Sequence, residues 1–162
     1  MKPLNLPKLS QEALLNGANM FLMPCNNELL DYDCEDFIET SKLLTLKESP
    51  YQIGDEVYLQ EEFAYDGLNM LTYKNEWNNT KWEWFNTSEM KEHQSRYKGV
   101  ITNIKVVRVQ DIIGNNKAIL MNRKDHLGYI EDIFEDWYNK QYNESAYERN
   151  DYVFLYTIEE IK

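Results

Sequence analysis

The sequence predicts one α+β domain over residues 1–162, folded as a small β-barrel with peripheral helices. Three observations indicate this fold class. Val100–Val109 is rich in β-branched residues, which pack well on a pleated surface and favour strands. Tyr152–Ile158 is a second, continuous apolar strand signal, whereas Leu127–Gln141 carries apolar residues at helical spacing. A chain of 162 residues is long enough to bury a core of its own without a metal or a disulfide.

The N-terminal quarter predicts a strand-like start, a short helix and a buried segment. Met1–Pro7 is expected to be extended. Ser10 is a favourable N-cap, and the helix that it begins should end at Gly17, because glycine accepts the left-handed conformation after a helix. Ala18–Cys25 is apolar without a helical stripe, which fits a buried strand or a buried loop. The polar, acidic segment Asn26–Asp36 predicts a loop.

The next stretch predicts a hairpin. Phe37–Leu46 fits either a strand or a helix. Pro50–Tyr65 predicts a half-buried strand that follows a turn at Gly54–Asp55, since its apolar residues alternate with polar ones. Leu68–Trp77 is expected to pair with this strand, because Asp66–Gly67 between them is a strong turn signal.

The strand Val100–Val109 alternates imperfectly between apolar and polar residues. A regular strand would place Val100, Ile104 and Val106 on one face and Ile101, Val107 and Val109 on the other. Apolar residues on both faces are typical of a central strand, or of a strand that bends between two cores. The following segment, Asn115–Lys124, is basic and is expected to be irregular.

Charge is distributed unevenly along the chain. The net charge is −11, which disfavours non-specific binding to nucleic acid or to an anionic membrane. The window 91–124 nevertheless contains eight basic and two acidic residues, a charge of +6, so that the rest of the chain carries −17. Two arrangements remain open. These side chains form a basic face on an acidic body, or they scatter over a strand and a loop without forming a patch.

Neither a metal site nor a cofactor is expected. Cys25 and Cys34 lack the spacing of a zinc site, and only His93 and His126 could complete one. The sequence also contains no Gly-rich phosphate loop and no nucleophile elbow. Two reduced cysteines and the absence of a long apolar run predict a cytoplasmic protein without a membrane span.

Several motifs from Pro50 onward resemble one family. The segment GDEVYLQEEF, which contains Gly54, Asp55 and Glu61, aligns with a family pattern Gly-Asp-Arg-Leu-Trp-Val-Arg-Glu-Thr-Trp. Ungapped spacing then places Trp84, Met90, Ser95 and Arg96 on a second pattern, and further similarity covers Gln110–Ile112, Phe134, Trp137 and Asn150–Val153. The chain therefore resembles the ASCH-like proteins of phage and prophage genomes, within the PUA-like superfamily. The resemblance implies a PUA-like β-barrel whose cleft holds RNA or a modified nucleoside.

One departure from the family bears on catalysis. Some small ASCH relatives are amidohydrolases that act on acetylated cytidine with a Lys, a Thr and a Glu. Asn19 falls where that Lys would be, and an amide cannot act as a general base. We therefore expect a binding protein rather than an enzyme, with no catalytic residues.

The candidate ligand-binding residues are Glu61, Ser95, Arg96 and Trp84. Glu61, expected in the middle of a strand, would either contact a base or form a buried ion pair with Arg96. Ser95 and Arg96 would grip a phosphate or a base edge, or else shape a turn. Trp84 would stack on a base or fill the core.

Three functions are therefore open. The first is a module that binds nucleic acid or a modified nucleoside through these four residues. The second is an acidic interaction protein that targets a host or defence protein through its acidic surface. The third is a nucleoside amidohydrolase, which the residue at position 19 disfavours.

Overall fold

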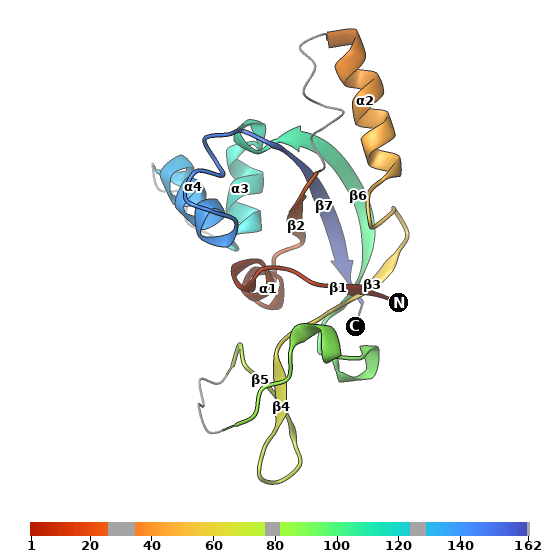
Figure 1. The fold of residues 1–162 in the computed structure, drawn as a ribbon, viewed down its shortest axis with the longest axis vertical. Coiled ribbons are helices and arrows are strands. Elements are labelled where there is room, and N and C mark those ends of the chain that lie inside the picture. Colours follow the sequence, from red (N-terminus) through yellow and green to blue (C-terminus); the bar gives the residue numbers. More distant parts are fainter. Residues whose placement is uncertain (26–34, 77–81, 124–128, 162) are drawn as a thin grey trace.

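The computed structural model describes residues 1–25, 35–76, 82–123 and 129–161, with only the backbone described for residues 35–40. It is a mixed α+β structure with a five-stranded sheet, a two-stranded sheet and four α-helices (Figure 1). Within the described residues, no helix combines the length and the apolar character needed to cross a bilayer.

The five-stranded sheet has the strand order β1-β3-β6-β7-β2. The strands of this sheet are β1 (Lys2–Leu4), β3 (Glu56–Leu59), β6 (Lys98–Arg108), β7 (Tyr152–Glu160) and β2 (Met20–Pro24). Only the β1–β3 pair is parallel. In the described part of the chain β1 and β2 are edge strands that do not pair with each other, so the sheet is open and does not form the expected closed barrel.

The helices cover both faces of this sheet (Figure 1). The helices α3 (Gly114–Leu120) and α4 (Ile130–Gln141) lie on one side, and α2 (Glu35–Lys47) lies along the other side, next to β6. The helix α1 (Lys8–Leu15) contacts β2 and α4. Of the two structures open for Phe37–Leu46, the helix is therefore confirmed, and Ala18–Cys25 contains the strand β2.

Two hydrophobic cores lie on the two faces of the sheet. Alternate residues of β7 divide between them: Phe154 and Tyr156 enter the core that also contains residues of α1, whereas Val153 and Leu155 enter the core beneath α3 and α4. This strand is buried on both faces and pairs with β6 on one side and β2 on the other. Its continuous apolar sequence reflects that central position.

A β-bulge in β6 places its residues on other faces of the sheet than a regular strand would. The register shifts between Ile101 and Asn103, so one extra residue sits in this strand opposite β7. Ile101 therefore packs in the same core as Ile104 and Val106, whereas Val107 and Val109 enter the other core. The assignment of Ile101 to the face of Val107 was wrong because a bulge reverses the alternation.

The N-terminal helix begins earlier than expected. Pro7 precedes the first helical residue, and Ser10 is buried inside α1. The Ser10 hydroxyl donates to Oε1 of Gln141 over 2.6 Å, so this residue ties α1 to α4 and is not the N-cap. The C-terminal end is as expected. Gly17 has φ +107°, and Ala18 N donates to Ala13 O over 2.9 Å in a glycine-terminated helix end.

The segment expected to be irregular and basic, Asn115–Lys124, instead contains most of α3. Lys117 points inward from this helix and is fully buried against α4, where Glu131 pairs with it. That partner comes from another element, which is why the local pattern did not reveal the helix.

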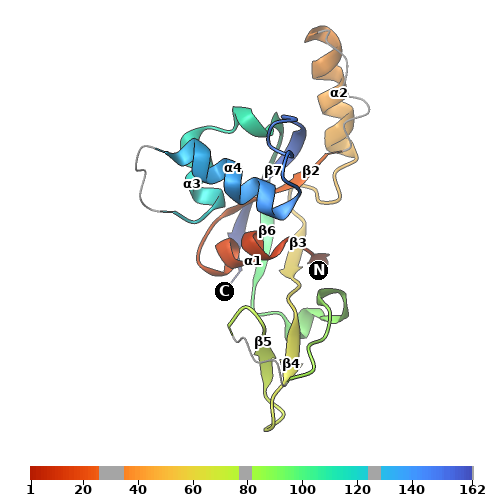
Figure 2. The same ribbon diagram turned by 60° about the vertical axis from the view of Figure 1, so that its left-hand side comes forward.

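The prediction that two strands pair as a hairpin around Asp66–Gly67 is confirmed. β4 (Phe63–Tyr65) pairs with β5 (Leu71–Tyr73) in an antiparallel two-stranded sheet, and Asp66 to Met70 form the connection. The single strand expected after the turn at Gly54–Asp55 is, however, divided into β3 and β4, which belong to different sheets. Figure 2 shows the hairpin projecting away from the helices and the main sheet.

Candidate functional site

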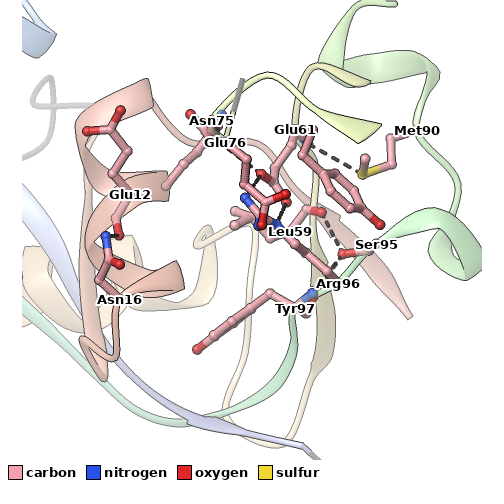
Figure 3. Close-up of polar contacts among 12 residues, drawn as sticks. Glu12, Asn16, Leu59, Glu61, Asn75, Glu76, Met90, Ser95, Arg96 and Tyr97 are labelled. Atoms are coloured by element: carbon pink, nitrogen blue, oxygen red, sulfur yellow. Dashed lines mark hydrogen bonds and ion pairs between the residues drawn. The ribbon is translucent and has the colours of Figure 1, made fainter. Parts of the chain in front are cut away.

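Glu61 and Arg96 meet at the junction between the main sheet and the hairpin (Figure 3). Glu61 lies in the link between β3 and β4, not in the middle of a strand as expected, and Arg96 lies two residues before the start of β6. The Arg96 guanidinium donates from Nε to Glu61 Oε2 over 2.9 Å and from Nη2 to Glu61 Oε1 over 2.8 Å. This two-point contact is the strong geometry between a guanidinium and a carboxylate.

The carboxylate of Glu61 is fully buried and accepts three hydrogen bonds from side chains. Beside the two bonds from Arg96, Asn75 Nδ2 donates to Glu61 Oε1 over 3.0 Å. The same amide nitrogen donates to Gln11 Oε1 on α1, also over 3.0 Å. Gln11 in turn donates to Leu6 O over 2.7 Å. The buried charge is therefore compensated by three N–H donors from two residues, Arg96 and Asn75, and Gln11 holds Asn75 in place.

Arg96 is only partly buried, with 24% of its side chain exposed. Its Nη1 donates to Glu76 Oε1, and its guanidinium carbon lies 4.6 Å from the centre of the Tyr73 ring. Burial lowers the pKa of Arg96, but the hydrogen bonds and charge of Glu61, with the charge of Glu76, more than offset it and leave the pKa raised. Arg96 is therefore a permanent cation that lies against an aromatic ring.

Burial, followed by the charge of Glu61, raises the pKa of the Tyr73 phenol. Its hydroxyl donates to Gln94 O over 2.7 Å, so the ring under the guanidinium is fixed in place. Tyr73 is thus a neutral, rigid support for Arg96.

A surface pocket of about 250 Å³ opens beside this ion pair. The lining residues come from the C-terminal end of α1, from the segment after β5 and from the segment before β6: Glu12, Leu15, Asn16, Asn75, Glu76 and Arg96. Figure 3 shows Glu12 and Asn16 one helical turn apart at the C-terminal end of α1, on the other side of the pocket from Arg96. The pocket thus joins two carboxylates, two amides and one guanidinium.

Ser95 has a structural position next to this site. Its hydroxyl donates to Leu59 O over 2.7 Å and contacts Tyr97 O over 2.9 Å. Of the two roles considered for this residue, these contacts fit the shaping of a turn between β3 and β6. They aim Arg96 toward Glu61, and Ser95 does not line the pocket.

Trp84 is half-buried, and it is not among the described residues that line the Arg96 pocket. Its ring packs edge-on against Trp82, with ring centres 5.7 Å apart. It is therefore neither at the ion pair nor a fully buried core residue. Trp77 and residues 78–81 of the same predicted loop lie outside the described residues.

The basic window does not gather into a single patch. Arg96 pairs with Glu61 and Glu76, Lys98 lies 3.8 Å from Glu92, and Lys117 is buried with Glu131. Arg108 lies over the Tyr152 ring and donates to Asn150 O. These four basic residues are therefore engaged with separate partners, which favours the scattered arrangement.

The remaining candidates have local roles. Asn150, with φ +50°, accepts a hydrogen bond from Gln110 N and shapes the turn before β7. His93 is exposed, and His126 and Cys34 lie outside the described residues. Asn19 is exposed, its backbone oxygen accepts from Ile158 N, and it does not line the Arg96 pocket. The described residues contain no group of three or more His, Cys, Asp or Glu placed to hold a metal.

Sequence reasoning missed most of the pocket. Glu12 and Asn16 are four residues apart on one helix, which does predict a shared face. Nothing in the local sequence, however, indicates that this face meets Arg96. Asn75 and Glu76 follow β5 directly, and only the hairpin pairing brings them to the ion pair.

Comparison of the chain with protein-family models, with curated proteins and with solved structures gives no match.

Proposed function

We propose that this protein is a binding module that holds the hydrogen-bonding edge of a nucleobase or a modified nucleoside in the Arg96 pocket. The observation that carries the proposal is the two-point Glu61–Arg96 contact, which fixes a guanidinium at the border of a pocket lined by carboxylates and amides. The resemblance to ASCH-like proteins of the PUA-like superfamily supports the same class of ligand and a cytoplasmic location.

The guanidinium of Arg96 has N–H donors available for such a ligand. A guanidinium carries five N–H groups in a fixed plane. Among the described residues, Glu61 and Glu76 use three of them, which leaves two for an acceptor that enters the pocket. The carboxylates of Glu12 and Glu76 are acceptors for an amino group on the same ligand. A base edge that presents a carbonyl beside an amino group, as cytosine does, matches this combination.

The charge of the pocket favours a base over a phosphate. Arg96 already faces Glu61 and Glu76, and Glu12 adds another carboxylate to the lining. A phosphate would enter a site of net negative charge, whereas a neutral or positively charged base would not be repelled. The scattered basic residues of the window 91–124 likewise offer no continuous track for a nucleic-acid backbone.

The contacts of Glu61 favour binding over catalysis. A general base needs a free lone pair within reach of the ligand proton. Three N–H donors already hold the Glu61 carboxylate, which is fully buried behind Arg96. We therefore propose a role for Glu61 in positioning Arg96, with no acid–base step.

Titration of the protein with cytidine, N4-acetylcytidine and uridine, followed by amide and side-chain NMR shifts, tests this proposal. Saturable shifts are expected at the pocket, in particular at Asn16, Asn75 and Arg96. Glu12→Gln should weaken binding by about tenfold, the effect of losing about 1.4 kcal/mol from one charge-assisted hydrogen bond.

Asp132→Asn is the matched control, because Asp132 is an exposed carboxylate on α4 outside the pocket lining. It should leave the affinity unchanged. The proposal fails if none of the nucleosides shifts the pocket resonances at millimolar concentration. Binding of single-stranded RNA that weakens steeply with salt, with no nucleoside binding, would instead indicate phosphate contacts.

A further inference from the structure

We propose that the end of the β4–β5 hairpin is a docking surface for another protein, whose complementary face is an apolar pocket with a basic rim. The docking surface consists of Tyr65, Leu68 and Met70 of the hairpin and of Phe85, which forms a β-bridge with Phe63 at the start of β4, and it is called the hairpin tip. This inference does not depend on the nucleoside pocket, because no residue of the hairpin tip lines that pocket.

The hairpin tip exposes large apolar side chains far from either core. Leu68 is 85% exposed and Met70 is 62% exposed, and Tyr65 and Phe85 are exposed as well. Figures 1 and 2 show the hairpin extending away from the main sheet and its helices. Single exposed apolar residues are normal on protein surfaces, but a group at the end of a projecting element is typical of an interaction site.

The turn that carries these side chains is held in one conformation. Asp66 Oδ1 accepts from Leu68 N over 2.8 Å and from Met70 N over 2.9 Å. The backbone of Asp66 also donates to Met70 O and accepts from Asn69 N, each over 3.0 Å. Asn69 has φ +60°, a left-handed conformation that asparagine tolerates well.

Four hydrogen bonds therefore fix the backbone on both sides of Leu68. A preorganised turn loses little conformational entropy when a partner binds, which raises the affinity that a small apolar contact can reach.

Ring contacts with the buried Phe63 hold two side chains of the hairpin tip in place. Phe85 stacks on Phe63 with ring centres 5.1 Å apart, and Phe63 meets Tyr65 edge-on at 6.3 Å. The Tyr65 hydroxyl also receives a hydrogen bond from Gln94 Nε2 over 2.9 Å. The exposed faces of Tyr65 and Phe85 are thus rigid, as is common for residues that dominate binding energy at interfaces.

Charge identifies the kind of partner. Of the four acidic residues in 61–76, Glu61 and Glu76 pair with Arg96 and Glu62 pairs with Lys74. The negative charge around the tip comes from Asp66 in the turn and from Glu83 and Glu89, and Lys91 is the next basic residue along the chain. An acidic surround favours a partner with basic residues around its apolar pocket. A second copy of the chain would bring the same acidic surround and a net charge of −11 against the first, which disfavours self-association through the tip.

The probe for this proposal is a short synthetic amphipathic peptide of Leu and Lys, labelled with a fluorophore, whose binding is followed by fluorescence anisotropy. The peptide presents leucines between lysines and therefore imitates an apolar face with a basic rim. The full-length protein should bind it, and the double variant L68S/M70S should bind it about tenfold more weakly or not at all, a difference of about 1.4 kcal/mol or more.

The double variant L43S/L44S is the matched control, because Leu43 and Leu44 are exposed leucines on α2, away from the hairpin. It should bind as the unchanged protein does. Since all four substituted residues are exposed, thermal unfolding should show that both variants fold.

Three outcomes would overturn the proposal. The first is equal binding by both double variants. The second is equally strong binding of a peptide in which Ser replaces every Leu, since attraction would then be purely electrostatic. The third is self-association in sedimentation experiments that L68S/M70S abolishes, because the tip would then contact a second copy of this chain.

Discussion

Two ion pairs among the described residues have one buried partner each, and they are built in opposite ways. At the junction with the hairpin the carboxylate of Glu61 is fully buried and its cation, Arg96, reaches a pocket. Beneath α4 the cation is buried instead: Lys117 is 1% exposed, whereas Glu131 is 62% exposed. Lys117 also lies 5.4 Å from the centre of the Phe134 ring and 3.4 Å from the Tyr147 hydroxyl.

This contrast shows which pair can serve a ligand. Arg96 keeps two N–H donors at the border of a pocket after satisfying its partners. Lys117 is enclosed by the rings of Phe134 and Tyr147 and by Glu131, and its side chain is buried. The first pair is therefore placed for binding, and the second stabilises the contact between α3 and α4.

The contrast also predicts, for each pair, which of the two partners lowers the free energy of unfolding more when it is replaced. Removing the exposed partner leaves a buried charge without compensation, whereas removing the buried partner leaves a charge that water can solvate. The more severe substitution should therefore fall on Arg96 in the first pair and on Glu131 in the second.

Arg96→Met is expected to have the largest effect. It leaves the fully buried Glu61 carboxylate with Asn75 as its remaining side-chain donor, which should lower the free energy of unfolding by about 3–5 kcal/mol. Urea denaturation followed by circular dichroism measures this change. The double variant Glu61→Leu/Arg96→Met should recover part of the loss, because no charge remains buried. If the double variant is as unstable as Arg96→Met, packing rather than charge governs this site.

Glu131→Gln should have the next largest effect, a loss of about 2–3 kcal/mol in the same measurement. The substitution leaves Lys117 buried with the Tyr147 hydroxyl and two aromatic faces as its compensation, which is more than Glu61 would retain. Asp132→Asn on the same helix is the control and should change the free energy of unfolding by less than about 0.5 kcal/mol. An equal loss in both variants would contradict the assigned role of Glu131.

Lys117→Met should change the free energy of unfolding by no more than about 1 kcal/mol, in either direction. Methionine can occupy the space between Phe134 and Tyr147, and Glu131 keeps its exposure and its 3.0 Å bond from the Tyr147 hydroxyl. The informative comparison is with Glu131→Gln, which removes the other half of the same pair. A larger loss for Lys117→Met than for Glu131→Gln would reverse the proposed asymmetry.

The same contrast separates what the sequence could and could not predict. Strands β6 and β7 were predictable because their β-branched and aromatic runs are long and local. Helix α4 was predictable from its apolar stripe, and the hairpin from the turn signal at Asp66–Gly67. Each of these signals lies within a few residues along the chain.

Features that depend on distant partners were not predictable in this way. Helix α3 was missed because Lys117 is buried only by virtue of Glu131. The bulge in β6 is set by its pairing with β7, and the pocket depends on α1 meeting the segment after β5. The pairing of Glu61 with Arg96 was one of two alternatives, and it came from aligned motifs rather than from local pattern.

The second pair also predicts a pH dependence of stability. The hydrogen bond from Lys117 lowers the pKa of the Glu131 carboxyl, against a smaller opposing effect of burial. A carboxyl whose pKa is lower in the folded state contributes stability above its unfolded pKa, near 4.5, and loses it as the pH falls through the folded value. The Lys117–Glu131 contribution should therefore be constant at neutral pH and disappear in acid.

Measurement of unfolding free energy against pH, for the unchanged protein and for Glu131→Gln, isolates this contribution. Asp55 also has a lowered pKa, through its hydrogen bond from Lys2, and it remains in both proteins, so only the difference between the two curves reports on Glu131. That difference should narrow as the pH falls below about 4.5, because protonated Glu131 and glutamine are then both neutral. Since Glu131 is largely exposed, added salt should reduce the effect further. A difference that stays constant through the acid range would mean that Glu131 supports α3 through packing and hydrogen bonding, without its charge.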